Sequence, residues 1–91
     1  MSKYDYKSLE EKLRTVVSYF ADKLNGEAVE QIKEFIEHGE YGEAYELLCH
    51  VVASAKQQIP ADVYEIIMEL GRQMELPNEI WEKIKPLRQH P

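Results

Sequence analysis

The amino-acid sequence predicts an all-α protein, a small bundle of four to five helices forming one domain over residues 1–91. Apolar residues recur at spacings of three and four along most of the chain, as they do on one face of a helix. Glycine and proline divide this pattern into segments of helical length. No stretch of four or more residues alternates between apolar and polar with β-branched enrichment, so no strand is expected.

The first helix is predicted to begin at Ser8, because the Ser-x-x-Glu sequence there has the form of a capping box. It should end at Asn25-Gly26, since both residues tolerate the left-handed conformation of a helix exit. Residues 1–7 and 88–91 are expected to be loose tails. The apolar positions of the first helix are Leu9, Leu13, Val16, Val17, Phe20 and Leu24.

The second helix is predicted from Glu27 to His38, with Gly39 as the residue after its C-terminal cap. His38 gains about 0.3–1 kcal/mol from the helix dipole there, which explains it without catalysis. A third helix should begin near Tyr41 and run to about Gln58. Its apolar face covers more than half of its circumference, which predicts the central helix of the bundle: Tyr41, Ala44, Tyr45, Leu47, Leu48, Val51, Val52 and Ala55.

Proline sets the limits of the last two helices. Pro60 suits the first turn of a fourth helix, and Pro77 opens a short fifth helix that Pro86 stops or kinks. Gly71 lies inside the apolar pattern of the fourth helix. It costs about 1 kcal/mol relative to alanine unless it lets another backbone approach closely.

The net charge of -6 is concentrated between residues 27 and 50, which hold seven glutamates against Lys33 alone. Residues 1–26 carry +1 and residues 51–91 carry -1. A field of one sign repels nucleic acid and attracts a basic partner. Like charges four residues apart, such as Glu30 and Glu34, mildly destabilise a helix. Recognition of a basic protein and an ordinary solvated face are both open at this point.

Tyrosines beside these glutamates are candidate anchors, because tyrosine is enriched at binding hot spots. Tyr41 and Tyr45 can be such anchors, although at least one of them is expected in the core. Tyr4 and Tyr6 either fold back onto the bundle or join a contact surface. The predicted partner-binding residues are Glu27, Glu30, Glu34, Glu37, Glu40, Tyr41, Glu43, Tyr45 and Glu46.

No catalytic, cofactor or metal site is predicted. Glu46 and His50 stand four apart on one helix face, but the further ligands of a zinc motif are missing. Cys49 lies within the apolar face and should be a buried thiol with a raised pKa in a reducing compartment. No apolar run reaches the roughly 18 residues of a membrane span and no signal-peptide core is seen, so a cytosolic protein without nucleic-acid or membrane partners is expected.

The central stretch, from Phe35-Ile36-Glu37-His38-Gly39 through Glu40-Tyr41-Gly42-Glu43-Ala44 to Leu47-Leu48-Cys49, resembles the MafI family of bacterial immunity proteins. Further matches to that family follow at similar spacing, and the resemblance covers about residues 28–88: Ile59-Pro60-Ala61-Asp62-Val63-Tyr64, Leu70-Gly71, Trp81-Glu82 and Lys85-Pro86-Leu87.

The resemblance implies a small cytosolic antidote that binds and blocks a cognate toxin domain, the C-terminal part of a CdiA- or MafB-type protein in contact-dependent growth inhibition. Several such toxins are RNases, among them EndoU-like nucleases that cut tRNA. No catalytic residue is carried over. Two other classes stay open: a helical adaptor that binds a peptide in an apolar groove, and a small enzyme or metal protein using Glu46, Cys49 and His50.

Overall fold

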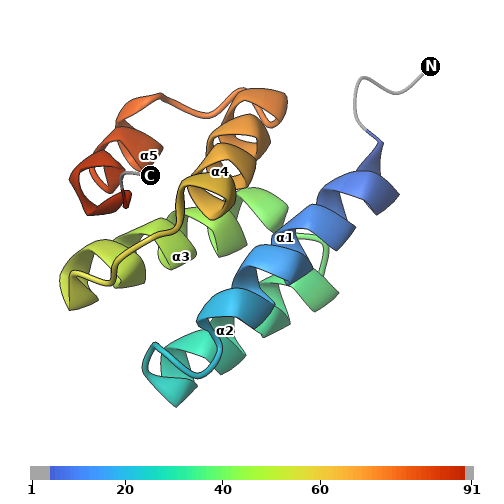
Figure 1. The fold of residues 1–91 in the computed structure, drawn as a ribbon. Helices are drawn as coiled ribbons and strands as arrows, with labels where there is room; N and C mark the ends of the chain where they lie inside the picture. The colour runs from blue at the N-terminus through green and yellow to red at the C-terminus, as the bar shows by residue number, and fades with distance from the viewer. Residues whose placement is uncertain (1–4, 90–91) are drawn as a thin grey trace.

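The computed structural model describes residues 5–89, and within this range the protein is all-α, as predicted. These residues form five α-helices and one short 3₁₀ helix (Figure 1). The bounds of the helices are α1 Tyr6–Phe20, α2 Gly26–Glu37, α3 Tyr41–Ala55, α4 Ala61–Gln73, α5 Glu79–Glu82 and η1 Lys85–Leu87. The described part of the chain has no strand, only one isolated bridge between Ile59 and Arg88.

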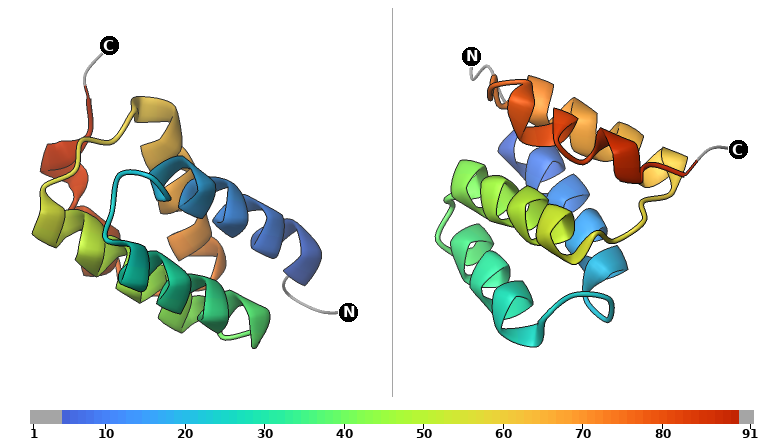
Figure 2. Two further views of the ribbon diagram at one scale, coloured as in Figure 1. Left: turned by 90° about the horizontal axis from the view of Figure 1, so that it is seen from below. Right: turned by 90° about the vertical axis from the view of Figure 1, so that its left-hand side faces the viewer.

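Helix α3 is the centre of the bundle, as its wide apolar face predicts. It packs against α2, α1 and α5, and it lies between α2 and the α5 segment (Figure 2). Helices α2 and α3 form an antiparallel hairpin joined by a short turn (Figure 2), while α1 also packs against α4. The residues that α3 buries are Ala44, Tyr45, Leu48, Cys49 and Val52.

The turn of the α2–α3 hairpin follows from two residues that the sequence identifies. Gly39 has a φ of 73°, the left-handed conformation that a helix exit requires. The Nδ1 of His38 lies 2.8 Å from the carbonyl oxygen of Glu34 and caps the last turn of α2. The predicted place of Gly39 after the cap is confirmed, and the turn brings α3 back along α2.

The start of α1 differs from the prediction. The helix begins at Tyr6, and the cap is Asp5, whose carboxylate accepts a hydrogen bond from the backbone N–H of Ser8 at 3.2 Å. Asp5 is as good a cap as serine, and it adds nearly one turn to the helix. Residues 5–7 are therefore not a loose tail, while residues 1–4, Tyr4 among them, lie outside the described range.

Helix α1 ends at Phe20, earlier than predicted, because Asn25 caps the next helix instead of ending this one. The Asn25 side chain accepts hydrogen bonds from the backbone N–H groups of Glu27 and Ala28, at 2.8 and 3.3 Å. These are two of the donors that a helix start leaves unpaired. Residues 21–25 therefore connect the two helices, and α2 begins at Gly26.

The C-terminal end was also expected to be loose, and residues 88–89 are not. The backbone N–H of Ile59 donates to the carbonyl of Leu87 at 2.9 Å, and the N–H of Gln89 donates back to the carbonyl of Ile59 at 2.7 Å. Helix α3 ends at Ala55, where Lys56 takes a left-handed φ of 51°, and this frees residues 56–60 to reach that contact. Residues 90 and 91 lie outside the described range.

Gly71 has a packing role that differs from the predicted one. A Cβ at this position would overlap the ring of Trp81 and lie 2.7 Å from the hydroxyl of Tyr45. The glycine thus admits two side chains rather than another backbone. In residues 5–89, no helix combines the length and the apolar composition that crossing a lipid bilayer requires.

Candidate functional site

The seven glutamates of the α2–α3 hairpin are all exposed, and we call them the acidic face: Glu27, Glu30, Glu34 and Glu37 on α2, Glu40 in the turn, and Glu43 and Glu46 on α3. The inward faces of the same helices are apolar and buried, which forces the charged positions outward. The spacing of the four glutamates on α2 predicts that they face solvent, and this is confirmed.

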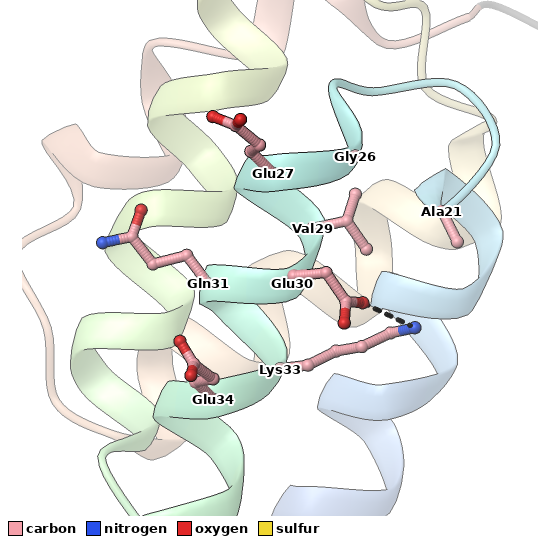
Figure 3. Close-up of a pocket in the computed structure, with 8 residues that line it drawn as sticks. All are labelled: Ala21, Gly26, Glu27, Val29, Glu30, Gln31, Lys33 and Glu34. Carbon is pink, nitrogen blue, oxygen red and sulfur yellow. Dashed lines mark ion pairs between the residues drawn. The ribbon is translucent and has the colours of Figure 1, made fainter.

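On α2 the acidic face divides into two stripes. In Figure 3, Glu27 and Glu34 point toward the α3 side together with Gln31, whereas Glu30 and Lys33 point toward α1. Lys33 forms an ion pair with Glu30, at 3.6 Å between Nζ and Oε2. One cation therefore offsets one acid on the α1 side, and Glu27 and Glu34 on the α3 side keep their negative field.

The depression drawn in Figure 3 is open and shallow, and most of its lining comes from the surface of α2. Sites for small ligands are concave and mostly apolar. This depression is open, and charged and amide side chains such as Glu27, Gln31 and Glu34 are part of its lining. Its shape suits contact with a macromolecule better than enclosure of a cofactor.

Helix dipoles account for some of these acids but not for others. Glu27 and Glu43 lie in the first turns of α2 and α3, where a negative charge is stabilising. Glu34 and Glu37 lie in the last turn of α2, which contains no basic residue. A negative charge at a helix C-terminus is unfavourable, so folding gives no reason for this pair.

Tyr41 is half-buried, so part of its side chain stays open to a partner. Its hydroxyl donates a 2.7 Å hydrogen bond to Oε1 of Glu10, and its ring centroid lies 6.3 Å from that of Tyr6. This hydrogen bond, with help from Arg14, lowers the pKa of the Glu10 carboxyl. The same bond raises the pKa of Tyr41, so the two side chains form a fixed pair between α1 and α3.

Tyr45 is a correction to the predicted set, because it belongs to the core. Its side chain is fully buried, and its hydroxyl donates a 2.6 Å hydrogen bond to the carbonyl of Ile67 on α4. Burial raises its pKa. A partner cannot touch this ring while the bundle is folded, so the anchoring role assigned to Tyr45 from sequence is wrong.

Cys49 is buried, as predicted, and burial raises the pKa of its thiol to about 12. A thiol in that state is a poor nucleophile, because the thiolate is the reactive form. Glu46 and His50 are exposed on α3. Among residues 5–89 no group of three or more His, Cys, Asp or Glu side chains is placed to hold a metal ion.

The structure adds a small pocket that the sequence does not reveal. It has a volume of about 220 Å³ and lies where α1, the α2–α3 turn and the end of α4 meet. Tyr6 forms part of its wall and is 55% exposed, the one large apolar side chain so exposed in residues 5–89. The only sequence signal was the presence of Tyr6 ahead of the first apolar face.

Comparison of the chain with known protein families, curated proteins and solved structures finds no match. The fold and the surface together define a class: a small helical domain that presents a negatively charged hairpin.

Proposed function

We propose that this chain is a cytoplasmic immunity protein, similar to those of the MafI family, which binds and neutralises a cognate bacterial toxin domain. The single observation that carries the proposal is the acidic face, seven exposed glutamates on one hairpin with Lys33 as the only base between residues 27 and 50. The kind of partner, a toxin domain, is what the resemblance of about residues 28–88 to that family implies.

The mechanism follows from charge. A nuclease toxin must present basic and polar groups to its RNA substrate, and an acidic hairpin can occupy that groove or a patch beside it. Complementary fields speed the encounter of two proteins toward about 10⁸ M⁻¹s⁻¹. Glu34 and Glu37 are the strongest candidates for contact, since the helix dipole disfavours acids at their positions.

The test is charge reversal at these two positions. Glu34→Lys with Glu37→Lys should slow association with the toxin encoded beside this protein at least tenfold at low salt. Helix α2 should keep its stability, because cations suit the C-terminal turn. Glu65→Lys with Glu69→Lys is the matched control, since both are exposed glutamates on α4. Equal rates for the two double variants would remove the acidic face from the mechanism.

A second candidate function, a helical adaptor for a peptide, is favoured by the apolar pocket beside Tyr6. Salt separates the two candidates. Association through the acidic face should weaken steeply between low and high ionic strength, because screening acts on exposed charges. An adaptor that binds through apolar contacts should bind equally well in both. The immunity function itself is lost if the protein fails to protect cells from the neighbouring toxin.

A further inference from the structure

The pocket beside Tyr6 is formed by three segments that are far apart in the sequence. Tyr6 and Leu9 come from α1, Gly39 and Gly42 come from the α2–α3 hairpin, and Met74 lies at the end of α4. Tyr41 and Leu76 complete the lining. Every one of these residues is apolar, aromatic or glycine. The pocket is therefore an apolar depression at one end of the bundle.

Its size limits what it can hold. Pockets for small-molecule ligands have volumes of about 300–1,000 Å³, and this one has about 220 Å³. A volume below that range suits one large side chain rather than a metabolite. The hydrogen bond from Tyr41 to Glu10 restrains the side of the pocket that Tyr41 forms.

The surroundings of the pocket are negative. Among the residues adjacent in sequence to its lining, five are acidic and one is lysine, besides His38: Asp5, Glu10, Glu40, Glu43, Glu75 and Lys7. Arg14 offsets Glu10 through a 2.9 Å ion pair, so the other four acids carry the negative charge. Glu40 and Glu43 also belong to the acidic face, so the pocket continues that surface. An apolar side chain that enters here therefore brings its neighbours close to carboxylates.

We propose that this pocket receives an apolar or aromatic side chain from a basic segment of a partner protein, with flanking Lys or Arg residues held by the surrounding glutamates. The inference rests on the proposed function and names the anchor that charge alone does not supply. Buried aromatic anchors within a ring of weaker contacts carry most of the affinity of protein complexes. The acidic face then sets the association rate of the partner, and the pocket sets its dissociation rate.

Short peptides test the chemistry without the toxin. The probes are Lys-Arg-Phe-Arg-Lys, the same peptide with alanine in place of phenylalanine, and Glu-Asp-Phe-Asp-Glu, each titrated at millimolar concentration and followed by NMR. The basic phenylalanine peptide should shift the signals of Gly39, Gly42 and Tyr6, and the other two should bind at least fivefold more weakly. Equal binding of the phenylalanine and alanine peptides would overturn the pocket, and equal binding of the acidic peptide would overturn its charge preference.

Gly42 lines the pocket, so a larger side chain at this position is a test of it. A Cβ at Gly42 meets nothing within 4 Å, and the same holds for Gly26 at the start of α2. Gly42→Leu should reduce binding of the basic phenylalanine peptide at least fivefold. The packing of the core should stay unchanged. Gly26→Leu is the matched control, because it places the same side chain on open space away from the pocket.

The toxin complex separates this inference from the proposed function. If the toxin is neutralised and Gly42→Leu leaves its dissociation rate unchanged, the pocket proposal is wrong and the immunity function stands. If the peptides bind as expected but no neighbouring toxin is neutralised, the pocket stands and the immunity function fails. Sedimentation at increasing protein concentration tests whether a second copy of the chain occupies the pocket. If the protein forms dimers that Gly42→Leu converts to monomers, the occupant is a second copy and the proposal is overturned.

Discussion

The indole ring of Trp81 occupies the space where Gly71 has no side chain, so that a Cβ on Gly71 would overlap ring atoms Cε3 and Cζ3. Tyr45 meets the same ring edge-on, with the two ring centroids 6.5 Å apart and an interplanar angle of 80°. One glycine of α4 therefore lets α5 pack against both α3 and α4. The glycine is part of the core, although it adds no buried side chain of its own.

Gly71→Ala should destabilise the protein by about 1–3 kcal/mol, the usual cost of overpacking a core. The direction is opposite to helix propensity, which favours alanine over glycine by about 1 kcal/mol. Urea denaturation measures the change. Gly42→Ala is the control, since its Cβ meets open space, and it should raise stability by about 0.5–1 kcal/mol. Equal effects of the two substitutions would contradict the packing described for Trp81.

Tyr45→Phe removes the hydroxyl that donates to the Ile67 carbonyl. The expected loss is about 1 kcal/mol, as for a typical intramolecular hydrogen bond. Affinity for any partner should stay the same, because the ring is fully buried. Denaturation and a binding titration on the same sample separate the two effects. A large drop in affinity with unchanged stability would return Tyr45 to the interface.

The helix number, the central place of α3 and the exposure of the glutamates could all be predicted from periodicity, because each depends on residues three or four apart. The role of Tyr45 could not. The apolar face of α3 is wide, and its pattern does not say which tyrosine faces another helix and which faces a groove. That distinction depends on Ile67 and Trp81, which lie on other helices.

The start of α1 shows that prediction from sequence is also limited for residues close together in the chain. Ser8 and Asp5 are both good cap residues, and the capping-box motif favoured the wrong one. The choice was decided by Asp5, whose carboxylate receives the Ser8 N–H. The pocket beside Tyr6 lay beyond prediction for a simpler reason: its walls come from residues as distant as Leu9 and Met74, and no local pattern brings these together.

Asp5→Ala should lower stability by about 0.5–2 kcal/mol, the usual loss for an N-cap. Ser8→Ala should change it by less than about 0.5 kcal/mol, as most surface substitutions do. Thermal or urea denaturation of the two variants makes the comparison. If Ser8→Ala is the more damaging of the two, the capping box is the true start of α1.

The Tyr41–Glu10 pair predicts two effects of pH. The pKa of Glu10 lies below its ordinary value of 4.5, so its contribution to stability is present above pH 4.5 and is lost as the pH falls through the lowered pKa. The pKa of Tyr41 lies above its ordinary value of 10.0, so its contribution is present below pH 10 and is lost as the pH rises through the raised pKa.

An NMR titration of the Glu10 carboxyl measures the first effect. Tyr41→Phe should move the pKa of Glu10 back toward 4.5 without restoring it fully, since Arg14 still lowers it. Arg14→Gln is the companion variant and should also raise the pKa of Glu10. No change in the Glu10 titration on Tyr41→Phe would show that the hydrogen bond is absent in solution.

Cys49 should react slowly with a thiol reagent in the folded protein, because burial both shields it and raises its pKa to about 12. The rate should rise by orders of magnitude in denaturant, where the thiol regains an ordinary pKa near 8.5. Absorbance after addition of an aromatic disulfide follows both rates. Rapid labelling without denaturant would place Cys49 at the surface and revive a chemical role for it.

The contact between Ile59 and residues 87–89 fastens the end of the chain to the start of α4. These hydrogen bonds close the segment from Ile59 to Gln89, which contains α4 and α5, into a loop. Helices α4 and α5 should therefore detach from α1 and α3 as one unit, and hydrogen exchange should report a common opening for both. A shortened chain that ends before Leu87 lacks this contact, and its α4 and α5 should then show separate openings.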